Sequence, residues 1–174
     1  RMGYEVHVAC NFKEGNTCDG KRLSELQRIL QDMRVVWYQW DCPRNINSVR
    51  KCVKAYRQLL TLTGLHHYEW LHCQSPVGGA LARLAAHRRN IRIVYTAHGF
   101  HFYHGAPWKN WMLYYPAEVF LAHWTDVLIT VNKEDYVFAK KRLRAGKIVY
   151  VPGVGIDTEK FSDVGMKGSR REFC

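Results

Sequence analysis

The sequence predicts an α/β domain: a Rossmann-like three-layer α/β/α arrangement around a mostly parallel sheet. Apolar runs of strand length alternate with helical patterns along the chain. Two runs, IRIVYTA at 91–97 and DVLITV at 126–131, are apolar along most of their length, which is typical of parallel strands covered on both faces. The 174 residues are 47% apolar and 24% charged, a composition that can bury the core of one folded domain.

The first part of the chain is expected to contain two strands and two helices. Gly3 can close the last turn of a helix, and residues 4–10 then form a strand. We therefore expect the natural chain to begin before Arg1, with a further strand and helix. The next helix has apolar residues at helical spacing, namely Leu23, Leu26, Leu30 and Met33. A short strand at 35–37 and a helix from residues 47–48 to Gly64 follow.

The second part continues the alternation. Strands are expected at 68–73, 91–97, 126–131 and 148–151. Helices are expected at 108–123 and 133–143, the second of them capped by Asn132.

Ser75 and Pro76 predict the start of a helix after strand 68–73. A serine hydroxyl can cap free backbone amides, and proline fits the first helical position. Gly78 and Gly79 fall in the first turn, where they permit either close packing against a strand or close approach of a ligand.

Charge and cysteine content limit the classes of function. Because 26 lysines and arginines outnumber 15 aspartates and glutamates, the net charge is +11, which favours an anionic partner such as nucleotide phosphates, a membrane surface or nucleic acid. Six scattered cysteines without a CxxC pair favour a reducing cytosol. No apolar run reaches the roughly 18 residues that a membrane-spanning helix needs.

The segment YTAHGFHFYHGAP, residues 95–107, places three histidines directly after a predicted strand. Ligands of parallel α/β sheets bind beyond the carboxyl ends of the strands, so His98 lies where this fold keeps its sites. Its imidazole can donate or accept a hydrogen bond near neutral pH. His101 and His104 lie in a glycine-containing loop, which favours packing of their rings against the sheet, and we expect no metal site.

Three segments together resemble a known family: YTAHGFHFYHGAPWKNWMLYYPAE, TDVLITVNKEDY and KIVYVPGVGIDTEKF. They are similar to the amino-terminal domain of the retaining GT-B glycosyltransferases of the group 1, family 4 class. Within that class the resemblance is strongest to enzymes that build bacterial capsular polysaccharide and exopolysaccharide. It covers residues 71–161, and before Leu71 it rests only on the order of strands and helices.

The resemblance implies an enzyme that transfers a sugar from a nucleotide-sugar donor, UDP-linked, to a lipid-linked or saccharide acceptor, without a further cofactor. Residues 1–153 would be the acceptor-side domain, one half of a GT-B fold. Residues 154–174 would be a linker toward a carboxyl-terminal donor-binding domain absent from this sequence, so the fragment alone is expected to be inactive. The alternative is a non-catalytic module that binds a sugar or a nucleotide sugar.

Carried over position by position, the resemblance makes His98 the catalytic residue, hydrogen-bonded to the sugar or acceptor near the reacting centre. It assigns acceptor binding to Gly99, Phe100, His101, Phe102, Lys109 and Glu118. The aromatic rings would stack on sugar rings, and Lys109 would meet an acceptor phosphate. For Glu118, pairing with a basic neighbour and contact with the substrate stay equally open.

Two helices suggest a membrane surface as a partner. Helix 47–64 carries Arg50, Lys51, Lys54 and Arg57 on one side, which is either a solvated face or a face for anionic lipid. Trp108 begins an aromatic helix, and its side chain either packs in the core or lies at a rim that meets the membrane interface. Trp111, Met112 and Phe120 of the same helix are expected in the core. We expect a cytoplasmic protein, peripheral on the inner face of the plasma membrane, and no nucleic-acid partner because no known nucleic-acid-binding pattern is present.

Overall fold

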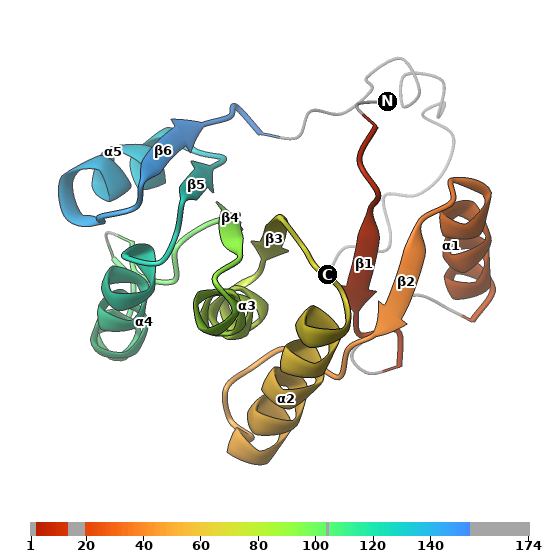
Figure 1. The fold of residues 1–174 in the computed structure, drawn as a ribbon. Coiled ribbons are helices and arrows are strands. Elements are labelled where there is room, and N and C mark those ends of the chain that lie inside the picture. Colours follow the sequence, from red (N-terminus) through yellow and green to blue (C-terminus); the bar gives the residue numbers. More distant parts are fainter. Residues whose placement is uncertain (1–2, 14–19, 104, 154–174) are drawn as a thin grey trace, which may run out of the picture.

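The computed structural model describes residues 3–13, 20–103 and 105–153. Over these ranges strands and helices alternate as the sequence predicts (Figure 1). In chain order they are β1 (His7–Cys10), α1 (Gly20–Asp32), β2 (Val36–Gln39), α2 (Val49–Leu65), β3 (Trp70–Gln74), α3 (Pro76–Arg89), β4 (Arg92–Ala97), α4 (Trp108–Ala122), β5 (Val127–Thr130), α5 (Lys133–Arg142) and β6 (Lys147–Tyr150). The Rossmann-like α/β class is confirmed.

Every strand pair in the described ranges is parallel, but the strands form two sheets. β1 pairs with β2, and a separate sheet has the order β3-β4-β5-β6. The sequence predicts a single sheet, because strand patterns show burial but not which edges meet. β4 is central in the larger sheet, between β3 and β5, and this sets the position of the residue that follows it.

The core of the molecule lies between the larger sheet and the helices on one of its sides. Figure 1 shows α2, α3 and α4 together on that side of the strands. Ile93, Tyr95 and Leu128 point into this core and are nearly inaccessible to solvent. Alternate residues such as Val94 and Ile129 face the other way and are only half-buried. This difference follows from the two-residue period of a strand.

One of the two predicted caps, that by Asn132, is present, and Ser48 caps α2 as well. The Ser48 side chain accepts a hydrogen bond from the Lys51 backbone at the start of α2, and Asn132 Oδ1 accepts one from the Asp135 N–H at 2.7 Å. The predicted cap by Ser75 is wrong: its φ is +66° and its side chain makes no capping hydrogen bond. A non-glycine residue in this backbone region carries strain.

The glycine pair in α3 serves close packing. A Cβ on Gly79 would lie 2.6 Å from the Tyr95 ring, and one on Gly78 would lie 2.8 Å from the Ser75 hydroxyl oxygen. Of the two predicted uses of Gly79, the contact with a neighbouring strand is the one that the structure contains.

Helix α4 is continuous through Pro116, and its apolar residues divide between core and solvent. Trp111 packs on Phe102 as expected. The prediction that Met112 and Phe120 are in the core is wrong, because their side chains are 65% and 58% exposed. The helix is apolar around most of its circumference, while only one side of it meets the sheet.

Candidate active site at the strand ends

His98 directly follows β4 at the carboxyl edge of the larger sheet and is exposed, as the sequence predicts. Its Nε2 lies 2.7 Å from Oε1 of Gln74, the last residue of β3. Because this amide oxygen can only accept, Nε2 carries the proton that it donates. In the neutral ring Nδ1 is then the nitrogen that can accept a hydrogen bond from a hydroxyl group. Two adjacent parallel strands thus fix both the position and the tautomer of His98.

A second histidine, His72, lies on β3 two residues before Gln74. Its Nε2 is 2.9 Å from the Thr96 hydroxyl oxygen on β4. Burial lowers the pKa of His72, and the charge of His98 lowers it further. The pair therefore resists carrying two positive charges, so that near neutral pH His72 acts as a neutral neighbour of His98.

The backbone after His98 turns sharply and is held by α5. Gly99 has φ of +150°, a region that side-chain-bearing residues avoid. The next residue, Phe100, donates its N–H to Asp135 Oδ2 at 3.0 Å. Asp135 is buried, and the same oxygen accepts a hydrogen bond from the Asn132 side chain at 2.7 Å. The first turn of α5 thus fixes the segment that begins with His98.

The structure corrects the role predicted for Phe100 and Phe102. Both are buried, and their rings stack on each other with centroids 4.9 Å apart. Phe102 also packs on Phe138 of α5. Rings that are covered by protein on both sides have no face for a sugar, so these residues anchor the segment instead.

Glu118 is likewise a structural residue rather than an acceptor ligand. Its carboxylate accepts hydrogen bonds from both terminal nitrogens of Arg83, at 2.8 and 2.9 Å, and one from the Tyr95 hydroxyl at 3.3 Å. All three side chains are buried, and Arg83 also lies over the Tyr95 ring. Burial raises the pKa of Tyr95, and the charge of Glu118 adds to the effect. The alternative of pairing with a basic neighbour is confirmed.

His101 and Lys109 remain on the surface. The rings of His101 and Tyr114 pack edge to face, with their centroids 4.8 Å apart. The backbone carbonyl oxygen of His101 accepts a hydrogen bond from the Asn110 side chain. Lys109 is exposed in the first turn of α4. Their binding roles stay predictions. His104 and the predicted linker 154–174 lie outside the described residues.

Sequence reasoning missed Gln74 and Asp135 as the residues that position His98 and its segment. Gln74 stands at a strand end, where a polar residue faces the site edge, and this was a usable signal. Asp135 lies in the first turn of α5, and no local pattern predicts its contact with Phe100, because the two residues are 35 positions apart in the sequence.

The described part of the chain has neither a cluster of metal ligands nor a helix that could span a membrane. It contains no group of three histidine, cysteine, aspartate or glutamate residues arranged to hold a metal ion. None of its helices combines the length and apolar character needed to cross a bilayer.

These observations define a class: a Rossmann-like α/β domain with an imidazole fixed at the carboxyl ends of adjacent parallel strands. The profile of Glycosyltransferase Family 4 matches residues 1–160, and the chain belongs to this family. It is 42% identical over 172 residues to a protein of Bacillus subtilis (strain 168) named "Putative glycosyltransferase EpsD". That match covers 94% of this chain and 40% of the relative, so the chain spans less than half of the relative's length.

Among solved structures, the chain is similar to MurG of Acinetobacter baumannii, with a TM-score of 0.50 and 12% sequence identity. The match covers 91% of this chain and 48% of the MurG chain. At this identity the similarity shows the fold alone. It agrees with one half of a GT-B fold, as the sequence predicts.

Proposed function

We propose that this chain is the acceptor-side part of a retaining glycosyltransferase that acts in the synthesis of a bacterial surface polysaccharide, a capsular polysaccharide or an exopolysaccharide. The donor is a nucleotide sugar, UDP-linked, and the acceptor is lipid-linked or a saccharide. Membership of Glycosyltransferase Family 4 supports the transfer chemistry and the class of donor. The protein works in the cytoplasm, peripheral on the inner face of the plasma membrane, and a further domain completes the active site.

The observation that carries the proposal is the placement of His98. Sugar transfer with retention develops positive charge on the sugar ring and negative charge on the departing phosphate. A neutral imidazole that can accept a hydrogen bond at Nδ1 suits contact with a sugar hydroxyl beside such a centre. Because Gln74 holds the other ring nitrogen, the ring is oriented before substrate arrives. Preorganised polar groups contribute more than groups that must be ordered during the reaction.

The acceptor-binding role is then limited to the exposed members of the predicted set, Gly99, His101 and Lys109. Gly99 lets the backbone approach a ligand closely beside His98, since its position is open to solvent. Lys109 is suited to an acceptor phosphate by its charge and its place in the first turn of a helix.

The test measures sugar transfer by the full-length protein that contains this domain, and compares the wild type with the His98→Ala variant. Loss of one polar group at the reacting centre should lower kcat/KM by at least about tenfold to a hundredfold. The matched control is His123→Ala, because His123 is exposed at the other end of α4 and bonds only to a backbone carbonyl of its own helix. His98→Ala with a normal rate and an intact fold would remove His98 from the mechanism. Sugar-nucleotide binding without any transfer would favour the non-catalytic module.

A further inference from the structure

The loop that begins at His98 alternates between buried and exposed side chains. Phe100 and Phe102 are buried, at 6% and 2% exposure. Their rings anchor the loop against α4 and α5. His101 and Tyr103, which alternate with them, are exposed. The loop therefore presents two rings to solvent directly after the candidate catalytic residue.

Three hydrogen bonds hold the backbone of these two exposed residues. The Tyr103 carbonyl oxygen accepts one from the Ala106 N–H at 2.9 Å and one from the Trp111 indole N–H at 3.3 Å. The His101 carbonyl oxygen accepts one from the Asn110 side chain at 3.0 Å. Because Trp111 and Asn110 belong to α4, the first turn of that helix fixes the place from which both rings project.

The side chain of Tyr103 has no partner among the described residues. It is 52% exposed, its ring packs on no other ring in the described ranges, and its hydroxyl group forms no hydrogen bond with a described residue. The His101 ring packs on Tyr114 and is otherwise exposed. A ring whose backbone is held in place, but which takes no part in packing, loses little further freedom when it binds a ligand.

Both rings lie within reach of a substrate that contacts His98. A chain extends by at most about 3.6 Å per residue, so the Cα atom of His101 lies within about 11 Å of that of His98, and the Cα atom of Tyr103 within about 18 Å. A saccharide chain with one sugar unit beside His98 can therefore reach these rings with its next units. The C–H groups on one face of a sugar ring pack on an aromatic face, and its hydroxyl groups form hydrogen bonds with imidazole and phenol groups.

We propose that His101 and Tyr103 form an aromatic platform that binds a sugar unit of the acceptor. The sugar stacks on the Tyr103 ring, and the His101 imidazole forms a hydrogen bond with one of its hydroxyl groups. The acceptor is then a saccharide chain of two or more sugar units, whether free or lipid-linked. A lipid phosphate without sugars leaves the platform empty. The inference rests on the proposed function and deepens it, because it names the class of acceptor.

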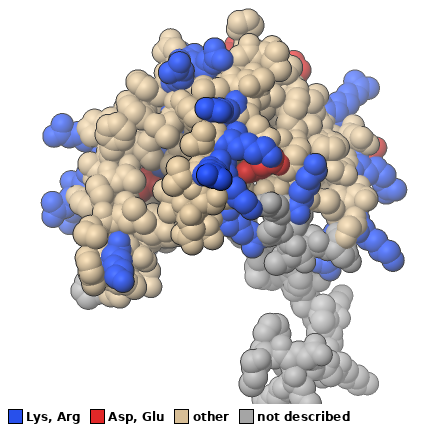
Figure 2. Space-filling view, turned by 90° about the horizontal axis from the view of Figure 1, so that it is seen from below, with Lys and Arg blue, Asp and Glu red and all other residues tan. Residues whose placement is uncertain are grey.

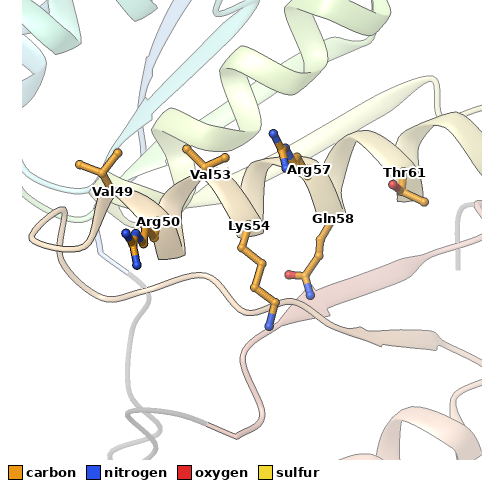
Figure 3. Close-up of a pocket in the computed structure, with 7 residues that line it drawn as sticks. All are labelled: Val49, Arg50, Val53, Lys54, Arg57, Gln58 and Thr61. Carbon is orange, nitrogen blue, oxygen red and sulfur yellow. The ribbon is translucent and has the colours of Figure 1, made fainter.

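The groove along α2 is a poorer place for the acceptor sugars. It has a volume of about 490 Å³, its lining contains no aromatic ring, and Arg50, Lys54 and Arg57 contribute cations to it (Figure 3). Figure 2 views the molecule from the side on which α2, α3 and α4 lie, and basic side chains gather near the centre of that face. Such a surface attracts anions more than a neutral sugar ring.

The first experiment measures binding of free disaccharides to the full-length protein without a donor, so the result does not depend on transfer. We expect saturation-transfer NMR to show contact between the wild type and at least one of two probes, cellobiose and diacetylchitobiose. Tyr103→Ala should weaken this binding about five- to tenfold, whereas Tyr103→Phe keeps the ring and should bind within about twofold of the wild type. The matched control is Tyr4→Ala, because Tyr4 is also exposed, at 69%, and precedes β1.

The second experiment measures transfer by the full-length protein to lipid-linked acceptors extracted from the cells that produce it. Tyr103→Ala should raise the acceptor KM about five- to tenfold and lower kcat less than about threefold, since the platform binds the acceptor away from the reacting centre. His98→Ala should lower kcat instead. Binding of farnesyl phosphate, which carries no sugar, should be equal in Tyr103→Ala and the wild type. Circular dichroism verifies that each variant is folded.

Failure of the platform and failure of the enzyme give different results. Transfer by the wild type, with an unchanged acceptor KM in Tyr103→Ala, would reject the platform and leave the proposed function intact. Disaccharide binding that depends on Tyr103, without transfer by the wild type, would support the platform and favour the non-catalytic module. The platform would also be rejected if the wild type bound neither disaccharide, or if Tyr4→Ala weakened binding as much as Tyr103→Ala.

Discussion

The region around the four-stranded sheet and the region around the two-stranded sheet are stabilised by different interactions. In the larger sheet, Ile93, Tyr95 and Leu128 are almost completely buried against α3 and its neighbours. In the described residues before α2, Phe12 is the only one that is buried, and α1 has no buried residue. The smaller region therefore has little apolar core of its own.

Polar side chains hold the smaller region to the rest. Trp40 donates its indole N–H to the Ala55 carbonyl oxygen of α2 at 2.8 Å. Asp41 accepts hydrogen bonds from Gln39 and Gln58 and pairs with Lys54. His7 of β1 is 2.7 Å from the Tyr68 hydroxyl oxygen just before β3. Because no ladder joins β1 to β3 in the described ranges, such contacts replace the backbone bonds of a continuous sheet.

The largest loss of stability is expected at the buried ion pair of the larger region, between Arg83 and Glu118. Glu118→Ala leaves the Arg83 guanidinium buried without its anion and should lower the free energy of unfolding by about 3–5 kcal/mol in urea titrations. Arg83→Met with Glu118→Leu removes both charges and should recover most of this loss. The control is Lys54→Ala at the pair of exposed Lys54 with partly exposed Asp41, expected to cost about 0–1 kcal/mol. Equal losses from the two single variants would contradict the distinction between the regions.

A smaller effect is expected at the junction between the regions. Trp40→Phe keeps most of the ring but removes the bond to Ala55, which should cost about 1–2 kcal/mol. Amide hydrogen exchange should accelerate in β1 and β2 before it changes in β4. Trp70→Phe serves as the control, because this residue is 42% exposed. Uniform acceleration across both sheets would show that they unfold as one unit.

Substitution of Tyr68 tests the contact between His7 of β1 and the residues just before β3. Burial, with smaller contributions from Tyr38 and Glu5, raises the pKa of Tyr68 to about 12, so the hydroxyl stays protonated at neutral pH. Tyr68→Phe should cost about 0.5–1.5 kcal/mol in thermal or urea unfolding. Tyr103→Phe, on a half-exposed ring, should cost less. No difference between them would mean that the bond to His7 adds nothing to stability.

The smallest effect is a dependence of stability on acid pH at Asp41. Hydrogen bonds from Lys54, Gln39 and Gln58 lower its pKa from 3.8 to about 2. A carboxylate with a depressed pKa contributes stability that is complete above its unfolded pKa and is lost as pH falls toward its folded pKa. As pH falls from 3.8 to about 2, the wild type should therefore lose the stability that the Asp41 carboxylate contributes. Asp41→Asn has no carboxylate at this position, so its stability should not show this loss. Parallel pH profiles for the two proteins would remove Asp41 from the links between the regions.

Local pattern located most elements of the fold. The Ser48 and Asn132 caps and the spacing of Leu23, Leu26 and Leu30 act within one or two turns of chain, so they can be recognised without a structure. The predictions were wrong where contacts with residues distant in the sequence decide the conformation or the burial of a side chain. Ser75 fits the capping rule, yet its backbone takes a positive φ at the junction of β3 and α3. Met112 and Phe120 fit a core pattern, but the sheet meets only the other side of their helix.

By itself the sequence determined the parallel α/β class, the family resemblance and the position of His98 at the end of a buried strand, because strand period, helix caps and motif residues are close in the chain. Only the tertiary structure decided that Gln74 orients His98, that Phe100 and Phe102 are anchors, and that Glu118 neutralises Arg83. These contacts join residues that are 24 to 35 positions apart or are set by packing on both sides of a ring. Such distances close only when the sheet and its helices come together.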